Sequence, residues 1–368
     1  MKIFYSILKL IFSKKFDFIF FSEEKSYQKY YILLIEKLLT KKYSIAYLSS
    51  DKNDFINLKG INNFYVGEGL TRMFAFMIVR SKFLFLTLPD LGYNEIKKQP
   101  DNINYYIYFF HAVNSAHRAF KKNAFNNYDI IFCAGEYHYN ELRKLEEINN
   151  SKKKFLPKTG YLYFDYLSKN NKELKKEDFV LVAPSWNYNK KNFLNETCLN
   201  LITNLLKSDQ KVFFRPHMEH HKRNKNTLNT IKEKFSTNKN FIFDEKTENL
   251  DSMLKSKILI TDNSGIAIEY MFSLKRPVIY FDYFSKIHNE LFDKINIKPM
   301  EDQIKEKFGY FVKEKHVDDL DLKHLISDAE KKFLDNSQNL QNFINKNFFN
   351  FENSLEKYIE FLQKKFNN

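Results

Sequence analysis

Short apolar runs alternate with helical patterns along most of this chain, and this alternation limits its fold more than any other feature. Runs rich in Ile, Phe, Tyr and Val that are separated by helices are typical of a parallel sheet with helices on both faces. The expected strands of a first series are Phe16–Phe21, Tyr43–Leu48, Lys82–Thr87, Tyr105–Phe110 and Asp129–Cys133. Those of a second series are Phe179–Ala183, Lys211–Phe214, Asn240–Phe243, Lys257–Ile260 and Pro277–Tyr280.

Helices are expected between these strands, and a polar, lysine-rich stretch at 168–178 separates the two series. The expected helices are Tyr27–Thr40, Thr71–Val79, Glu136–Glu147, Leu194–Leu206, Thr227–Phe235 and Ile266–Ser273. A chain of 368 residues exceeds one ordinary core. We therefore predict an α/β protein with two Rossmann-like domains, residues 1–170 and 171–316, facing each other across a cleft.

The two ends of the chain have amphipathic patterns. Residues 317–368 are expected to form a helical tail that packs back on the first domain, since Leu355, Ile359 and Leu362 share one helical face. At the other end, Ile3, Ile7, Leu8 and Ile11 recur at helical spacing beside lysines. This first helix either covers a core or lies on a membrane interface, and no segment is long and apolar enough to span a bilayer.

The chain is strongly basic, with a formal net charge of +14. Only seven of its 59 basic residues are arginines, and Lys, Asn, Ile and Phe are all abundant, which indicates compositional bias rather than a surface that reads nucleic acid. A basic face turned to anionic lipid or to an anionic polymer is compatible with this charge. Cys133 and Cys198 lack metal-ligand spacing and favour a reducing, cytoplasmic setting.

Ligands of open α/β sheets bind beyond the carboxyl ends of the strands, so the residues that follow each strand are the candidate site. His111 follows the strand at 105–110, and His117 and Arg118 come soon after it. An imidazole at such a position is suited to proton transfer near neutral pH. The alternative is a histidine that satisfies local backbone groups.

The strand at 211–214 is followed by Arg215 and His217, with His220 and His221 close behind. Arginine supplies forked N–H donors and histidine supplies one or two, so the pair can flank a diphosphate. One alternative is a surface turn with a solvated arginine. A zinc cluster of the three histidines is another, but no Cys or carboxylate spacing completes it.

The third strand ending, meaning the residues that directly follow a strand, lies in Leu259–Glu269. There a strand leads into a helix through Thr261, Asp262, Asn263, Ser264 and Gly265. The unsatisfied N–H groups and the dipole of a helix N-terminus favour a bound phosphate. The alternative is that Ser264 or Asn263 only caps the helix. Glu269, just over one helical turn beyond Ser264, can reach a ribose or be a solvated carboxylate.

A fourth ending, Val180–Trp186, closes its strand with Pro184 and Ser185 and carries the single tryptophan. In order along the chain, the four endings read His111–Ala112, Ala183–Trp186, Arg215–Met218 and Thr261–Gly265. This series resembles the CDP-glycerol glycerophosphotransferase family, which includes the teichoic-acid primases and polymerases. That family shows His-Gly, Ala-Pro-Thr-Trp, Arg-Pro-His-Pro and Thr-Asp-Tyr-Ser-Ser at these places. The departures from these motifs include Ala112, Met218, Asn263 and Gly265.

The resemblance implies a GT-B fold and transfer of a phosphopolyol from a CDP-linked donor, with release of CMP, to a hydroxyl of a cell-envelope or capsule glycan or lipid-linked acceptor. It implies that His111 is the general base, that His217 takes part in catalysis, and that Glu269, Pro184 and Ser185 contact the nucleoside. The pyrophosphate would be held by Arg215, Thr261, Asp262, Asn263, Ser264 and Gly265. His117 and Arg118 would lie on the acceptor side, and neither a metal nor a cofactor is implied.

Two other functions remain compatible with the sequence. One is a GT-B glycosyltransferase that uses a nucleotide sugar in capsule or lipopolysaccharide synthesis, since the turn at 262–266 with Glu269 also resembles the turn of such enzymes. The other is a non-catalytic binder of anionic polymers. For the transferase, we expect a cytoplasmic protein attached peripherally to the inner face of the membrane, with no nucleic-acid partner.

Overall fold

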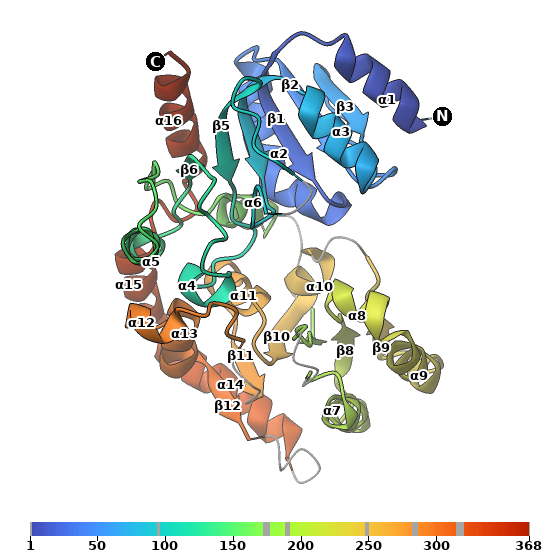
Figure 1. Cartoon of the computed structure of the whole chain (residues 1–368). Coiled ribbons are helices and arrows are strands. Elements are labelled where there is room, and N and C mark those ends of the chain that lie inside the picture. Colours follow the sequence, from blue (N-terminus) through green and yellow to red (C-terminus); the bar gives the residue numbers. More distant parts are fainter. Residues whose placement is uncertain are drawn as a thin grey trace. The chain divides into compact units, whose positions relative to one another are not determined.

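The computed structural model describes residues 2–93, 96–171, 177–187, 192–246, 250–281, 286–313 and 320–367. The chain divides into two compact units (Figure 1). The first unit comprises Met1–Tyr166, His288–Ile297 and Asn347–Asn368, and the second comprises Leu167–Ile287 and Lys298–Lys346. The expected boundary at 316–317 and part of the expected linker, residues 172–176, lie outside the described residues.

The first unit is built on a parallel sheet of six strands in the order β3-β2-β1-β4-β5-β6. Its central strands are buried almost throughout because they carry continuous runs of Phe, Ile and Leu. The strands are β1 (Phe16–Ser22), β2 (Ile45–Ser49), β3 (Ile61–Tyr65), β4 (Ser81–Leu86), β5 (Ile103–Tyr108) and β6 (Ile130–Ile131).

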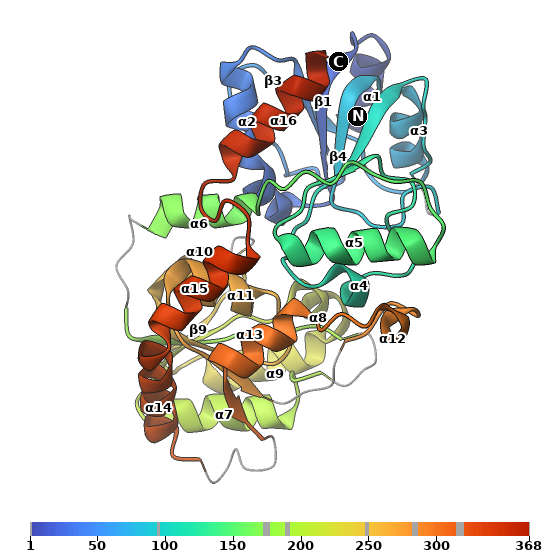
Figure 2. The same cartoon turned by 90° about the vertical axis from the view of Figure 1, so that its left-hand side faces the viewer.

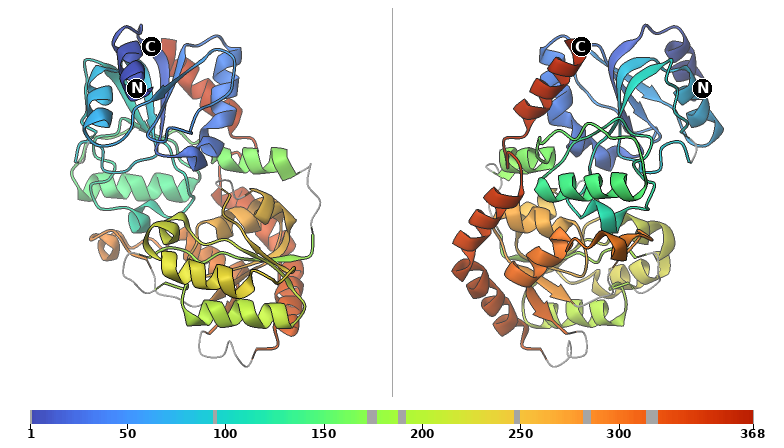
Figure 3. Two further views of the ribbon diagram at one scale, coloured as in Figure 1. Left: turned by 90° about the vertical axis from the view of Figure 1, so that its right-hand side faces the viewer. Right: turned by 60° about the vertical axis from the view of Figure 1, so that its left-hand side comes forward.

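Helices cover both faces of this first sheet. Figures 2 and 3 show α1 and α3 on one face and α2 and α16 on the other. The helices of this unit are α1 (Lys2–Ile11), the short 3-10 turn η1 (Lys25–Tyr27), α2 (Gln28–Thr40), α3 (Leu70–Ile78), α4 (Ala116–Ala119), α5 (Glu136–Ile148), α12 (Phe292–Ile295) and α16 (Leu355–Asn367). Helix α6 (Leu162–Asn171) leads into the second unit.

The second unit has its own six-stranded parallel sheet, in the order β12-β11-β10-β7-β8-β9. Its strands are β7 (Phe179–Val182), β8 (Lys211–Phe214), β9 (Phe241–Phe243), β10 (Ser256–Thr261), β11 (Val278–Phe281) and β12 (Tyr310–Val312). Its helices are α7 (Glu196–Lys207), α8 (Met218–Arg223), α9 (Lys225–Phe235), α10 (Leu250–Lys255), α11 (Ile266–Leu274), α13 (Met300–Phe308), α14 (Leu322–Asp335) and α15 (Ser337–Asn347).

Both sheets have the same topology. Within each unit, the strands taken in chain order lie in the spatial order 3-2-1-4-5-6 of a Rossmann sheet. The order reverses between β1 and β4 in the first sheet and between β7 and β10 in the second, so these are the two switch points where ligands are expected. The prediction of an α/β protein with two Rossmann-like sheets is confirmed.

Two parts of the fold differ from the pattern in the sequence. The apolar pattern does not predict β3 and β12, because each buries only one side chain, Phe64 in β3 and Val312 in β12. The expected tail is also divided between the units: α14 and most of α15 belong to the second, whereas α16 belongs to the first and packs beside α2.

A glycine at position 160 permits this return of the C-terminal segment. Gly160 has φ of +101°, and a Cβ there would lie 2.3 Å from the carbonyl oxygen of Phe349. The Gly160 carbonyl also accepts a hydrogen bond of 3.0 Å from the Tyr358 hydroxyl of α16. Gly160 therefore meets both a conformational and a steric requirement that no other residue meets.

We expect Gly160→Ala to lower the free energy of unfolding by about 2 kcal/mol or more, because the new methyl group displaces the C-terminal segment. Gly60→Ala is the matched control, since Gly60 has φ of +95° but its Cβ would meet only Leu39, at 3.6 Å. Chemical denaturation of both variants measures the difference. Equal losses in the two variants would contradict a steric role for Gly160.

Candidate functional site

His111 lies just beyond β5 in the first unit, as the sequence predicts. Its ring meets the rings of Tyr27 and Tyr30 edge-on, with centroids 5.4 and 6.2 Å away. Its Nδ1 is buried and has no hydrogen-bond partner among the described residues. Burial, and then the charge of Lys29, lower the pKa of His111 to about 4, which is below the neutral range expected from the sequence. The ring is thus uncharged at neutral pH and able to accept a proton.

Helix α5 holds the loop that follows His111. The Tyr137 hydroxyl donates to the carbonyl of Val113 at 2.7 Å, and His138 Nε2 lies 2.9 Å from the carbonyl of Asn114. The amide of Ala116 donates to Glu141 Oε2 at 2.6 Å. Glu141 is fully buried, so α5 fixes the loop at three successive points.

His117 and Arg118, predicted on the acceptor side, are both buried in this loop. His117 Nδ1 lies 3.2 Å from Glu141 Oε1, and its Nε2 lies 2.9 Å from the carbonyl of Ile297. Its ring stacks on Phe292, and the carbonyl of Arg118 accepts from the amide of His288. These contacts attach the segment 288–297 to the first unit, and an acceptor-side role for either residue stays a prediction.

In the second unit, the predicted residues gather at the switch point between β7 and β10. Asp262 accepts hydrogen bonds from the amide and the hydroxyl of Ser185, at 2.8 and 2.6 Å. Thr261 Oγ1 donates to the carbonyl of Ala183 at 2.6 Å. Thr261 and Asp262 are buried. These hydrogen bonds join the end of β10 to the end of β7. The carboxylate of Asp262 is hydrogen-bonded to Ser185.

Arg215 and His217 follow β8, next to β7. Arg215 Nη1 lies 2.7 Å from Asp244 Oδ2, so a carboxylate beyond β9 orients the guanidinium. His217 is exposed, its amide donates to the carbonyl of Pro184, and its Nδ1 accepts from the amide of Glu219 at 3.2 Å. Since Nδ1 accepts, the neutral ring carries its proton on Nε2 and can donate from there.

The surrounding protein, and then the charge of Lys286, lower the pKa of His217 to about 4. The other two histidines have protein partners: His220 Nε2 lies 3.0 Å from the carbonyl of Ser185, and the ring of His221 meets that of Phe243. Within the described residues, no group of three His, Cys, Asp or Glu is placed to hold a metal ion. The zinc alternative therefore gains no support from this cluster.

Helix α11 begins at Ile266, the first residue of the predicted helix. Its N-cap residue is Gly265, which has no side chain to cap the helix, and Asn263 Oδ1 accepts from Lys305 Nζ. Binding of an anion by the amides of this turn, and capping by Asn263 or Ser264, both stay predictions. Glu269, predicted at the ribose, is buried within α11.

Two lysines near this turn are absent from the sequence motifs. Lys286 Nζ lies 2.5 Å from the hydroxyl of Ser185, and Lys305 stands over the ring of Tyr280 beside Asn263. Lys286 follows β11, so an inspection of every strand end would have found it. Lys305 belongs to α13 and follows no strand, so the sequence carries no signal for it. The two lysines supply positive charge near a helix N-terminus, which suits a diphosphate.

Comparisons with known proteins match the part of the chain that carries these residues. The family model of CDP-glycerol:poly(glycerophosphate) glycerophosphotransferases matches residues 101–289, slightly more than half of the chain. That range includes every predicted site residue from His111 to Glu269. A search among curated proteins finds no match.

Solved structures match nearly the whole chain. The wall teichoic acid polymerase TagF superposes with a TM-score of 0.63 and 15% identity over 96% of this chain and 90% of that chain. It has also been solved with CDPG. A putative UDP-N-acetylglucosamine 2-epimerase from Listeria monocytogenes gives a TM-score of 0.60 and 10% identity over 96% and 97% of the two chains. At these identities the likeness shows the fold alone, which confirms the expected GT-B-type class.

We expect Lys29→Met to raise the pKa of His111 above about 4, because it removes a positive charge that disfavours the imidazolium. Titration of isotope-labelled histidines by NMR measures this shift, with His111→Asn to assign the signal. Lys37→Met, on the same helix, is the control. An unchanged His111 titration in Lys29→Met would show that burial alone sets this pKa.

Proposed function

Since the chain belongs to the CDP-glycerol:poly(glycerophosphate) glycerophosphotransferase family, we propose that it transfers glycerol phosphate, or a similar phosphopolyol, from a CDP-linked donor. The acceptor is a hydroxyl of a cell-envelope or capsule glycan or lipid-linked molecule, and CMP is released. The observation that carries this proposal is the cluster at the second switch point, within the matched residues. There Arg215, His217 and the N-terminus of α11 supply donors suited to a diphosphate.

In the proposed reaction, the acceptor oxygen attacks the phosphorus that bears the glycerol. A new P–O bond forms, the P–O bond to CMP breaks, and CMP leaves with the bonding electron pair. His111 takes the proton of the acceptor hydroxyl, since its ring is uncharged at neutral pH. Arg215, Lys286 and the α11 amides stabilise the charge on the departing CMP, and positioning with charge stabilisation accounts for most of such catalysis.

His217 supports the same step from the donor side, because its Nε2 proton is available to a phosphate oxygen. Asp262 and Thr261 act indirectly, by holding Ser185 and the turn before α11 in place. Lys286, whose Nζ contacts the Ser185 hydroxyl, binds the donor phosphates together with the amides of that turn. Glu269 is proposed to contact the ribose, although its carboxylate is largely buried.

The proposed function gives His111 a role in the transfer step and Arg215 a role in donor binding. His111→Ala is expected to slow transfer by about 10²- to 10⁴-fold while donor affinity stays near that of the unmodified protein. Arg215→Ala is expected to weaken donor binding by about tenfold or more. CMP release measures the first effect, and calorimetry with CDP-glycerol measures the second.

Arg223→Ala is the matched control, because Arg223 is an exposed arginine of α8 that pairs with Glu219. A panel of CDP-glycerol, CDP-ribitol and nucleotide sugars decides between donor classes. Consumption of a nucleotide sugar but of no CDP-linked donor would favour the glycosyltransferase alternative. Donor affinity lost equally in His111→Ala and Arg215→Ala would refute the proposed roles, and unchanged transfer in His111→Ala and His217→Ala would favour the binding protein.

The function also includes attachment to an anionic membrane surface. Within the described residues, no helix combines the length and the apolar composition that crossing a membrane demands. However, α1 and the neighbouring α3 expose large apolar side chains, which are Phe4, Tyr5, Leu8, Ile11 and Phe12 on or beside α1 and Leu70, Phe74 and Met77 on α3. Lys9, Lys14 and Lys15 are exposed beside them. Apolar side chains flanked by lysines are typical of helices that lie in the bilayer interface.

We expect the double variant Phe12→Ser, Leu70→Ser to reduce binding to vesicles of phosphatidylcholine and phosphatidylglycerol by about tenfold, because both side chains are more than 80% exposed and gain most from burial in lipid. Cosedimentation measures the bound fraction. Leu334→Ser, at an exposed leucine of α14, is the control. Equal vesicle binding by all three proteins would contradict attachment through this face.

A further inference from the structure

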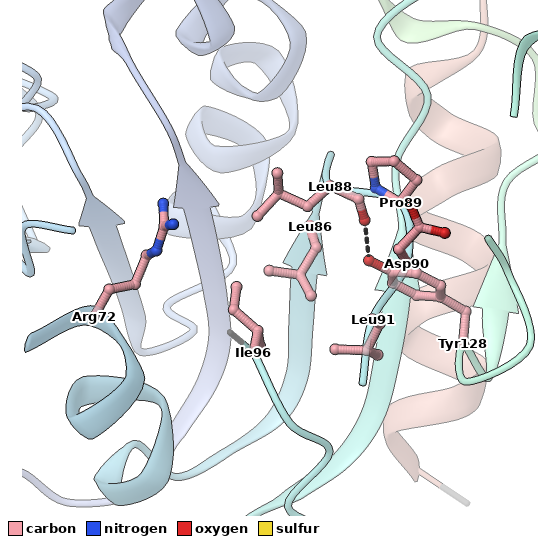
Figure 4. Close-up of a pocket in the computed structure, with 8 residues that line it drawn as sticks. All are labelled: Arg72, Leu86, Leu88, Pro89, Asp90, Leu91, Ile96 and Tyr128. Atoms are coloured by element: carbon pink, nitrogen blue, oxygen red, sulfur yellow. Dashed lines mark hydrogen bonds between the residues drawn. The ribbon is translucent and has the colours of Figure 1, made fainter. Parts of the chain in front are cut away.

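A pocket of about 330 Å³ opens in the first unit, apart from the residues that the motifs identify. Figure 4 shows its lining. The walls are mainly apolar: Leu86, Leu88, Pro89, Leu91, Ile96 and Tyr128. Arg72 and Asp90 lie on opposite sides of these apolar residues (Figure 4). An apolar pocket of this size with a few polar groups is typical of a small-molecule site.

The pocket lies where topology predicts a ligand. Leu86 is the last residue of β4, and Leu88 to Leu91 form the turn directly after it. The order of the first sheet reverses between β1 and β4, so this turn belongs to the switch point of that sheet. His111, beyond the neighbouring strand β5, stands at the same carboxyl edge.

The lining of the pocket is rigid where the chain turns. The Tyr128 hydroxyl donates to the carbonyl of Leu88, and Asp90 has φ of +63° while its amide donates to the carbonyl of Ala124. Asn127 Nδ2 in turn donates to the carbonyl of Leu91 at 2.7 Å. Three hydrogen bonds from one loop therefore fix the turn 88–91, and the pocket is built into the fold.

Charge and continuity identify the ligand class. Arg72 is on α3, the helix whose Leu70, Phe74 and Met77 are exposed on the proposed membrane face. Arg72 thus belongs both to the lining of the pocket and to a helix of the proposed membrane face, and its Nη1 donates to the Ser50 hydroxyl at 3.3 Å. Asp90 on the far side repels an anion, so a negative group is favoured only near Arg72. These features suit a hydrocarbon chain that carries a phosphate, and they do not suit a sugar, which needs many polar partners.

We propose that this pocket binds the hydrocarbon chain and the adjoining phosphate of a lipid-type acceptor. The proposal rests on the proposed function, because it identifies what the transferase holds while an acceptor hydroxyl reacts. The chain is buried among Leu86, Leu91 and Ile96, and Arg72 pairs with the phosphate. The pocket then anchors the acceptor in the same unit as His111.

The test uses farnesyl phosphate and farnesol, which share one chain and differ in the phosphate. Calorimetry with the full chain is expected to show binding of both, with farnesyl phosphate tighter. Leu88→Trp fills the pocket from a half-buried position and is expected to weaken both probes by about tenfold. Arg72→Met is expected to weaken farnesyl phosphate by about fivefold and to leave farnesol unchanged. Leu334→Trp, in the second unit, is the matched control.

Calorimetry with CDP-glycerol on the same variants separates this proposal from the proposed function. Unchanged donor affinity with weakened probe binding supports the pocket as the acceptor site. Probe binding that is unaffected by both Leu88→Trp and Arg72→Met would overturn the pocket proposal while leaving the transferase intact. Tighter binding of lysophosphatidic acid than of farnesyl phosphate would assign the pocket to membrane phospholipid and overturn the acceptor assignment. If the pocket binds the probes but no CDP-linked donor is bound or consumed, only the proposed function fails.

Discussion

In each unit, one buried carboxylate holds a loop that carries predicted site residues. In the first unit, Glu141 accepts from the amide of Ala116 at 2.6 Å. In the second, Asp262 accepts from the amide and the hydroxyl of Ser185. Burying a carboxylate is costly unless it is hydrogen-bonded, so each is stable only while its loop keeps this shape. The same bonds that satisfy these carboxylates therefore fix the loops that carry His111 and Ser185.

Electrostatic differences between the units follow from their side chains. In the second unit, Lys286 lies at Ser185 and Lys305 at Asn263, before a helix N-terminus, while Arg215 follows the neighbouring strand β8 and pairs with Asp244. Near His111, in contrast, tyrosine rings and one lysine surround an imidazole that burial keeps uncharged. One environment favours binding of an anion, and the other keeps the imidazole unprotonated, so that its lone pair is available to a hydroxyl proton.

Much of the fold follows from local pattern, because most of the ten predicted strands are buried runs that the sequence shows directly. Strands β3 and β12 lack such runs, since each buries a single side chain, although the partly exposed edge strand β9 was predicted all the same. At the site, the rule that ligands bind beyond strand ends located His111, Arg215 and the turn before α11. It did not distinguish Asp262, which holds a loop, from residues predicted to bind the pyrophosphate, such as Ser264, because both roles use short polar residues. Glu141 and Lys305 come from helices and depend on tertiary packing that no local pattern records.

The two sheets have one topology and two chemistries, and this contrast explains how a single architecture can serve two substrates of opposite character. Reversal of strand order opens a crevice at each switch point, whatever residues line it. Polar turns and lysines fill the surroundings of the second crevice, which suits a charged, water-soluble donor. Leucines, Ile96 and one arginine line the first, beside a helix that exposes apolar side chains. The proposed donor and acceptor would need this division, because burial of a hydrocarbon chain favours apolar walls whereas phosphates need cationic donors.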